Sequence, residues 1–133
     1  MPVSFSYIGD GGILVKSEGD VKGREIKEIN DIIYESAEKT KGISYQICDF
    51  QNASNVSISQ TDVRQIARQD KKAFEINPEM LIAIVTSTDL GFGLSRMWES
   101  LANGSPFETK VFRNLKEAQH WIRENLKKTA GGK

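Results

Sequence analysis

The chain has 133 residues, of which 38% are hydrophobic and 27% are charged. This length and composition are typical of one globular domain that can bury its own core. Basic and acidic residues both number 18, so the formal net charge is zero. Because binding to a phosphate backbone normally requires a basic excess, we expect no nucleic-acid partner.

Cysteine usage and hydropathy limit where the protein is expected to work. The single cysteine, Cys48, excludes an intrachain disulfide. The first residues lack a basic region followed by an apolar run, so no signal peptide is predicted. The longest apolar run, 80–85, is far too short to span a membrane. We therefore predict a cytoplasmic protein without a membrane span.

The first half of the chain predicts a hairpin, a helix and a third strand. Apolar residues alternate over 3–7 and return at 13–19, and the glycine-rich turn at 9–12 separates the two runs. Apolar residues then recur at helical spacing over 21–39. A further apolar stretch at 43–50 is predicted to be the third strand.

The second half is predicted to add three helices and two strands after a polar loop. These are the loop 51–58, helix 59–76, strand 80–85, helix 89–102, strand 107–112 and helix 115–126. Helices that alternate with strands imply a largely parallel sheet, and the initial hairpin makes that sheet mixed. We therefore predict one α/β domain over 1–126, with a five-stranded sheet and four helices. A flexible tail is predicted at 127–133.

The element order, the polar loop after the third strand and one late segment resemble a known family. That segment is KVFRNLKEA (110–118), followed by Trp121 and Ile122. Together these features resemble the SpoIIAA-like bacterial proteins of the STAS/SEC14-type superfamily, over nearly the whole chain. The resemblance implies a STAS-like fold. It also implies a function, because well-understood members are anti-sigma-factor antagonists that bind a kinase and are switched by serine phosphorylation. Other relatives hold lipids or other apolar ligands between helix and sheet.

The resemblance places the regulated serine near the start of the second helix. The matching region here, 49–61, offers Ser54, Ser57 and Ser59 as phosphorylation candidates. It departs from the family pattern, because none of the three lies in an aspartate-serine-glycine turn. Ser59 also has Asp62 three residues later, which is the spacing of a capping box and predicts a helix N-cap.

Phe92 and Arg96 are the predicted interface residues. If the apolar residues of helix 89–102 face the sheet, these two side chains lie one turn apart on the outward side. The arginine could then lie over the aromatic ring, and such a pair is typical of an interface anchor. We predict that they contact a protein partner or a second copy of the chain, as in a homodimer. The alternative is a single surface aromatic without a partner.

Two carboxylates stand at positions where chemistry is conceivable. Asp49 ends the third strand, where ligands of open α/β sheets gather, or it hydrogen-bonds the amides of the loop that follows. Asp70 interrupts the apolar stripe of its helix. A carboxylate half-buried there would have a raised pKa, whereas a small rotation of the helix would place it at the solvated margin.

Catalytic and cofactor patterns are missing from the sequence. One histidine, His120, and one cysteine cannot build a His/Cys metal cluster or a recognisable catalytic triad. The glycines at 91 and 93 lack the third glycine of a dinucleotide-binding loop, since Arg96 stands at its position. We therefore predict no catalytic residue, no cofactor and no metal.

The leading hypothesis is a non-enzymatic regulatory or protein-interaction module. The alternative is a carrier of a lipid or other apolar small ligand, held in a cavity between helices and sheet. Large apolar residues are candidates to line such a cavity, namely Met80, Met97, Trp98, Phe107 and Trp121. A small enzyme would require carboxylates from distant segments to converge.

Overall fold

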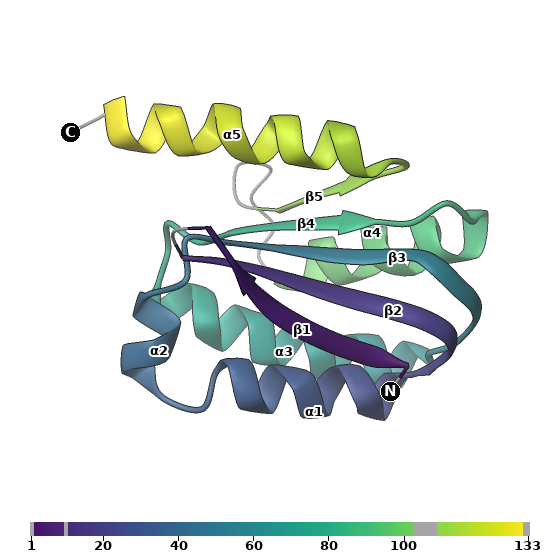
Figure 1. Ribbon diagram of the computed structural model, residues 1–133. Coiled ribbons are helices and arrows are strands. Elements are labelled where there is room, and N and C mark those ends of the chain that lie inside the picture. The colour runs from purple at the N-terminus through teal and green to yellow at the C-terminus, as the bar shows by residue number, and fades with distance from the viewer. Residues whose placement is uncertain (1, 10, 103–108, 132–133) are drawn as a thin grey trace.

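The computed structural model describes residues 2–9, 11–102 and 109–131, with side chains up to residue 126. Strands and helices alternate along the chain after an initial hairpin (Figure 1). In order they are β1 Val3–Ile8, β2 Gly12–Lys22, α1 Gly23–Ile33, α2 Ala37–Lys41, β3 Tyr45–Ser57, α3 Gln60–Ile76, β4 Leu81–Val85, α4 Asp89–Ala102, β5 Thr109–Phe112 and α5 Leu115–Gly131.

The five strands form one mixed sheet in the order β1-β2-β3-β4-β5. β1 and β2 pair antiparallel, and every later neighbour pairs parallel. The predicted fold class, a mixed and largely parallel five-stranded sheet, is thus confirmed. Each parallel strand is added on the same side of the one before it. Because such crossovers are right-handed, α1, α3 and α4 must all lie on one face of the sheet.

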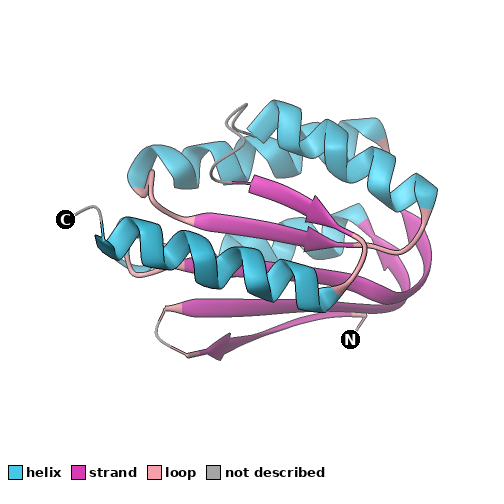
Figure 2. Ribbon diagram, turned by 90° about the horizontal axis from the view of Figure 1, so that it is seen from above, coloured by secondary structure: helices cyan, strands magenta, loops and turns pink. Residues whose placement is uncertain are grey.

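α5 follows the last strand and covers the opposite face (Figure 2). The buried apolar residues accordingly form two clusters. The larger one joins the sheet to α1, α3 and α4, and includes Ile26, Ile66 and Trp98. The smaller one joins Ala118 and Ile122 of α5 to residues such as Ile47, Ala83 and Phe112.

The prediction of a polar loop at 51–58 is wrong, because β3 continues through this segment to Ser57. β2 is also long, with 11 residues against 13 in β3, and its second half pairs with this segment as far as Lys22 opposite Ser57. The register shifts twice along that stretch, and Gly19 adopts a φ of +66° beside the second shift. A glycine tolerates this backbone conformation without strain. Backbone pairing between distant segments therefore makes a strand out of a polar sequence.

The helix predicted at 21–39 is two helices, which gives five helices rather than four. Val21 and Lys22 remain in β2, so α1 starts only at Gly23. α1 ends at Ile33, and the Ser36 side chain starts α2 by accepting a hydrogen bond from the Lys39 amide at 3.1 Å. α5 extends to Gly131, into the segment predicted as a tail.

None of the described helices is long and apolar enough to cross a membrane.

Candidate functional site

A cavity of about 80 Å³ lies between the sheet and the helices α1, α3 and α4. Most of its lining is apolar. Three half-exposed residues line it: Val56 near the end of β3, Ile58 just after β3, and Leu94 on α4. Since these residues lie at or beyond the carboxyl ends of β3 and β4, the cavity approaches the surface where ligands of open α/β sheets usually bind.

A buried carboxylate, Asp70 of α3, lies on the cavity wall and is 5% exposed. Its two oxygens accept hydrogen bonds from Tyr34 Oη at 2.6 Å and from Trp98 Nε1 at 2.7 Å. Gln46 Nε2 donates in turn to Tyr34 Oη at 2.6 Å, and lies 3.6 Å from Met80 Sδ. Side chains from α1's C-cap, α3, α4 and β3 thus form one polar cluster around Asp70.

Burial sets the protonation of this cluster. It raises the pKa of Asp70 to about 6, against the opposing effect of the hydrogen bonds from Tyr34 and Trp98. Burial, and then the charge of Asp70, also raise the pKa of Tyr34 well above its ordinary value, so its hydroxyl stays a donor. Asp70 therefore changes charge near neutral pH while both of its partners remain protonated.

Cys48 also lines the cavity as a free thiol. Burial, followed by the charges of Asp70 and Asp49, raises the pKa of Cys48. A thiol that does not ionise is a poor nucleophile. Because both oxygens of Asp70 already accept hydrogen bonds, the carboxylate is also poorly placed to abstract a proton from a ligand.

Within the described residues, no group of three or more His, Cys, Asp or Glu side chains could hold a metal ion. His120 is exposed on α5, on the face opposite the cavity. The described lining of the cavity offers apolar contacts and a few hydrogen-bonding groups.

Asp49 is 7% exposed and does not line the cavity. Its Oδ1 accepts a hydrogen bond from the Gln51 amide at 2.9 Å. Of the two roles considered for this carboxylate, the structure gives the contact with a following amide. That amide lies within β3 rather than in a loop.

The structure does not bring Phe92 and Arg96 together. Arg113, which follows β5, places its guanidinium 4.3 Å from the centre of the Phe92 ring. Arg113 also donates to Asp89 Oδ1 at 3.2 Å. Arg96 instead forms an ion pair with Glu99, at 3.6 Å. A cation does lie over the Phe92 ring, as expected, but it belongs to Arg113. Arg113 is not on the same helix, so helical spacing could not predict this contact.

Two residues of α4 that were predicted to face the sheet point to solvent. Leu90 is 65% exposed and Leu101 is 43% exposed. Leu94, Met97 and Trp98 do pack against the core, as expected. The first turn of α4 is therefore rotated so that Gly91 is buried and Leu90 is not.

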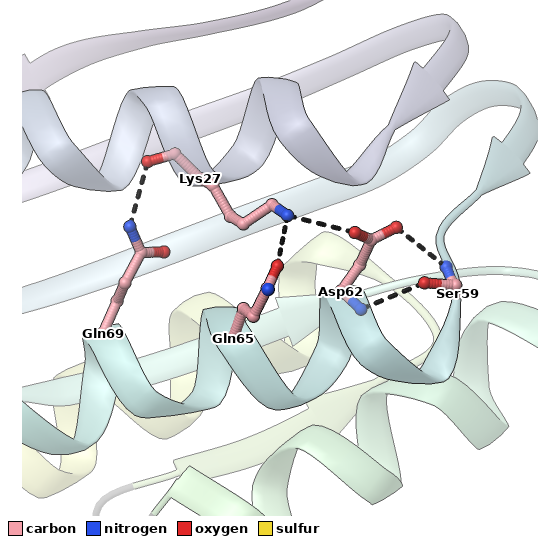
Figure 3. A network of polar contacts seen from close by, with 5 residues as sticks. All are labelled: Lys27, Ser59, Asp62, Gln65 and Gln69. Carbon is pink, nitrogen blue, oxygen red and sulfur yellow. Dashed lines mark hydrogen bonds and ion pairs between the residues drawn. The ribbon is translucent and has the colours of Figure 1, made fainter.

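Ser54, Ser57 and Ser59 are all exposed, close in sequence to the start of α3. Ser59 is the N-cap of α3, and its capping box with Asp62 is complete. Ser59 Oγ accepts from the Asp62 amide at 3.0 Å, and Asp62 Oδ2 accepts from the Ser59 amide at 3.0 Å (Figure 3). Ser54 and Ser57 lie in the extension of β3.

Asp62 also links α3 to α1. Lys27 Nζ lies 3.1 Å from Asp62 Oδ1 and also donates to Gln65 (Figure 3). The hydrogen bond from the Ser59 amide, followed by that from Lys27, lowers the pKa of Asp62. Gly23 makes the close approach possible, because a Cβ there would lie 2.4 Å from Asp62 Cγ.

Sequence reasoning missed Tyr34 and Gln46 as members of the polar cluster. Tyr34 fell inside a helix predicted to be continuous, and Gln46 lay in a strand with no sign of a buried partner. Of the residues proposed to line a cavity, Trp98 does so. Trp121 packs on the α5 face, and Phe107 lies outside the described residues.

Solved structures are similar to this one over nearly its whole length. The unphosphorylated form of the anti-sigma factor antagonist SpoIIAA matches 91% of this chain and 97% of its own, with a TM-score of 0.63 and 9% identity. The phosphorylated form of the Bacillus cell fate determinant SpoIIAA matches 90% of this chain and 98% of its own, with a TM-score of 0.58 and 11% identity. The chain has the SpoIIAA fold.

At such identities the likeness to SpoIIAA is one of fold, and it confirms the resemblance inferred from the element order. No protein-family model matches the sequence, and no curated protein is significantly similar to it.

Proposed function

We propose that this chain is a non-enzymatic regulatory module that acts by binding another protein. The observation that carries the proposal is the SpoIIAA fold over 91% of the chain, since the matched structure is that of an anti-sigma factor antagonist. The geometry agrees with this role, because the buried carboxylate has both oxygens engaged and the cavity thiol does not ionise. The partner is then an anti-sigma factor, a protein of similar type, or a second copy of the chain.

The surface proposed for this contact lies where the strands β3, β4 and β5 lead into their helices. We call it the end surface and define it by Ser57, Ser59, Leu90, Phe92 and Arg113. Leu90 is 65% exposed, and Phe92 is half-buried under the guanidinium of Arg113. Arginine and aromatic residues are enriched at protein interfaces, and the exposed Leu90 adds apolar area beside them.

Phosphorylation of a serine is the proposed means of regulation, and Ser57 is the candidate best placed for it. Its register partner on β2 is Lys22, so a phosphate there would lie near a cation. Phosphate on Ser59 would instead disrupt the capping box and add charge beside the Asp62 carboxylate. Ser54 is exposed as well, but it lies further from the start of α3.

Site-specific photo-crosslinking in the native host tests the proposal. A photoreactive amino acid is placed at position 90, and the matched control carries it at position 120, an exposed site on α5. We expect a discrete protein adduct from position 90, none from position 120, and loss of the adduct in a Ser57→Asp background. Equal adducts from both positions, or an adduct from position 120 alone, would contradict the proposal. The mass of the adduct distinguishes a self-complex from a different partner.

A further inference from the structure

We propose that Asp70, Tyr34 and Gln46 form a hydrogen-bond relay with two states, in which a proton on Asp70 reverses the chain and turns the side-chain amide of Gln46. The three residues belong to α3, the C-cap of α1 and β3, so a protonation event on a helix is passed to the sheet. Gln46 pairs with Ile13 of β2 and Ile82 of β4, so the relay ends in the interior of the sheet. It operates inside the domain, whether or not the end surface binds a protein, and so goes beyond the function proposed above.

With Asp70 ionised, the relay runs in one direction, from β3 to α3. Gln46 Nε2 donates to Tyr34 Oη at 2.6 Å, and Tyr34 Oη donates to Asp70 Oδ1 at 2.6 Å. Trp98 Nε1 donates to the other oxygen, Oδ2, at 2.7 Å. Gln46 is 1% exposed and Asp70 is 5% exposed, and a buried polar group that loses its partner is costly. We therefore expect a change in protonation to be accommodated by the chain itself.

The indole of Trp98 decides which oxygen of Asp70 takes up the proton. An indole N–H can only donate, so Oδ2 has to remain an acceptor. A proton taken up by Asp70 is therefore held on Oδ1, where it points at Tyr34 Oη. A tyrosine hydroxyl can accept this bond, but its own proton must then turn to another acceptor. Protonation of Asp70 thus reverses the first link of the relay.

Gln46 is the residue that can receive the reversed bond. Its Nε2 only donates and its Oε1 only accepts, and both belong to one planar group. A turn about the last torsion of the side chain presents Oε1 to Tyr34 Oη, and this torsion has a broad, roughly two-fold preference. The turn also gives up the contact of Nε2 with Met80 Sδ, at 3.6 Å, but a thioether is a weak acceptor. A glutamine at position 46 therefore serves both states of Asp70.

Among the described residues, Asp70 is the member of this cluster that titrates near neutral pH. Burial raises the pKa of Asp70 to about 6. Two other titratable side chains face it, Tyr34 from the C-cap of α1 and Cys48 from β3, and burial raises the pKa of both, so they stay protonated. α4 contributes Trp98, which does not titrate. Charged side chains on the helices packed around α3 pair with one another, in the pairs Lys27–Asp62, Arg96–Glu99 and Lys39–Glu35.

Side-chain NMR signals followed between pH 4.5 and 8 test the relay. The indole N–H of Trp98 contacts Asp70 directly, and we expect its signal to shift with a midpoint near pH 6. The amide of Gln46 should shift with the same midpoint. Its cross-relaxation with the Met80 methyl should weaken as pH falls, because the turn moves Nε2 away from the sulfur. The amide of Gln60, exposed on the first turn of α3, is the internal control and should show neither change, and Asp70→Asn protein should lose both.

Two variants separate a reversing relay from a fixed one, because they move the midpoint in opposite directions. Tyr34→Phe removes a donor to the ionised carboxylate and should raise the midpoint. Gln46→Leu removes the acceptor that the reversed Tyr34 hydroxyl needs. This disfavours protonated Asp70 and should lower the midpoint by about 0.5–1 pH unit, the value of one neutral hydrogen bond. If Gln46 only donated and never turned, its removal would weaken Tyr34 as a donor and raise the midpoint instead.

Three results would overturn the proposal: a Trp98 indole signal that does not titrate, a Met80 cross-peak of equal strength at pH 4.5 and pH 8, or a midpoint that is unchanged or raised in Gln46→Leu. If Gln46→Leu fails to fold, the Met80 cross-peak of the parent protein still decides. The crosslinking test of the end surface is independent of these outcomes, so failure of one proposal is distinguishable from failure of the other.

Discussion

The two faces of the sheet differ in the kind of side chain that they bury. On the α5 face, Ala118 and Ile122 pack on apolar strand residues such as Ile47 and Phe112, and the buried cluster there is apolar. On the opposite face, three helices share the cavity and the polar cluster around Asp70. The side chains that pack against α5 are therefore apolar, whereas the opposite face also buries polar groups beside a cavity.

The same difference appears in how the helices are held. α1 and α3 are joined by polar contacts from Lys27 to Asp62 and Gln65, and by Gln69 Nε2 donating to the Lys27 carbonyl at 3.1 Å (Figure 3). α5 depends on buried apolar area, whose contribution is insensitive to pH. We infer that pH changes act on the three-helix face, and each prediction below tests that contrast.

The largest effect is expected from Asp70→Ala. This change leaves Trp98 Nε1 and the Tyr34 hydroxyl without their acceptor inside the core. At about 1–3 kcal/mol for each unsatisfied buried donor, the free energy of unfolding should fall by about 4 kcal/mol. Urea denaturation at pH 7 measures it. The Asp70→Asn control keeps an acceptor for one donor and should lose less. A loss below about 1 kcal/mol would show that the polar cluster contributes little to stability.

A pH dependence of stability is the next largest effect. The folded-state pKa of Asp70, about 6, lies above its ordinary value of 3.8, so between these values the folded state holds a proton that the unfolded chain releases. The stabilisation is fully present below pH 4 and is lost as pH rises through 6, by up to about 3 kcal/mol. The lowered pKa of Asp62 acts below that window.

Denaturation midpoints measured between pH 4 and 7 check this dependence, with Asp70→Asn as the comparison. As pH rises from 4 to 7, the unfolding free energy of the parent should fall relative to that of Asp70→Asn. A pH-independent difference would mean that Asp70 titrates at its ordinary pKa.

The smallest effect belongs to the α5 face. Ile122→Val removes one methylene from the apolar cluster and should cost about 1 kcal/mol. The cost should be equal at pH 4 and pH 7. A pH-dependent cost would show that the two faces are coupled through the sheet.

The fold could be predicted from the sequence because most helices and strands show the spacing of apolar residues that is typical of their type. The strand 80–85 and the apolar spacing of α3 and α4 each signal their structure without reference to the rest of the chain. Two local predictions failed. The polar stretch after Phe50 became strand because the distant β2 pairs with it. Leu90 became exposed because the neighbouring Gly91, and not Leu90, packs beside Thr86.

The candidate site was largely hidden from sequence reasoning. Asp70 stood out as a carboxylate on an apolar stripe, but its partners Tyr34 and Trp98 are contributed by α1's C-cap and by α4. Such convergence depends on how the helices lie across the sheet, which no spacing along the chain encodes. Arg113 was missed as the partner of Phe92 for the same reason.

The most direct test of the account compares the two faces when the partner binds. Isoleucine methyl spectra are recorded before and after addition of the protein captured by crosslinking at position 90. We expect Ile58 and Ile84, which line the cavity near the end surface, to shift while Ile47 and Ile122 stay in place. Shifts confined to Ile47 and Ile122 would contradict the account, because they would place the working surface on α5.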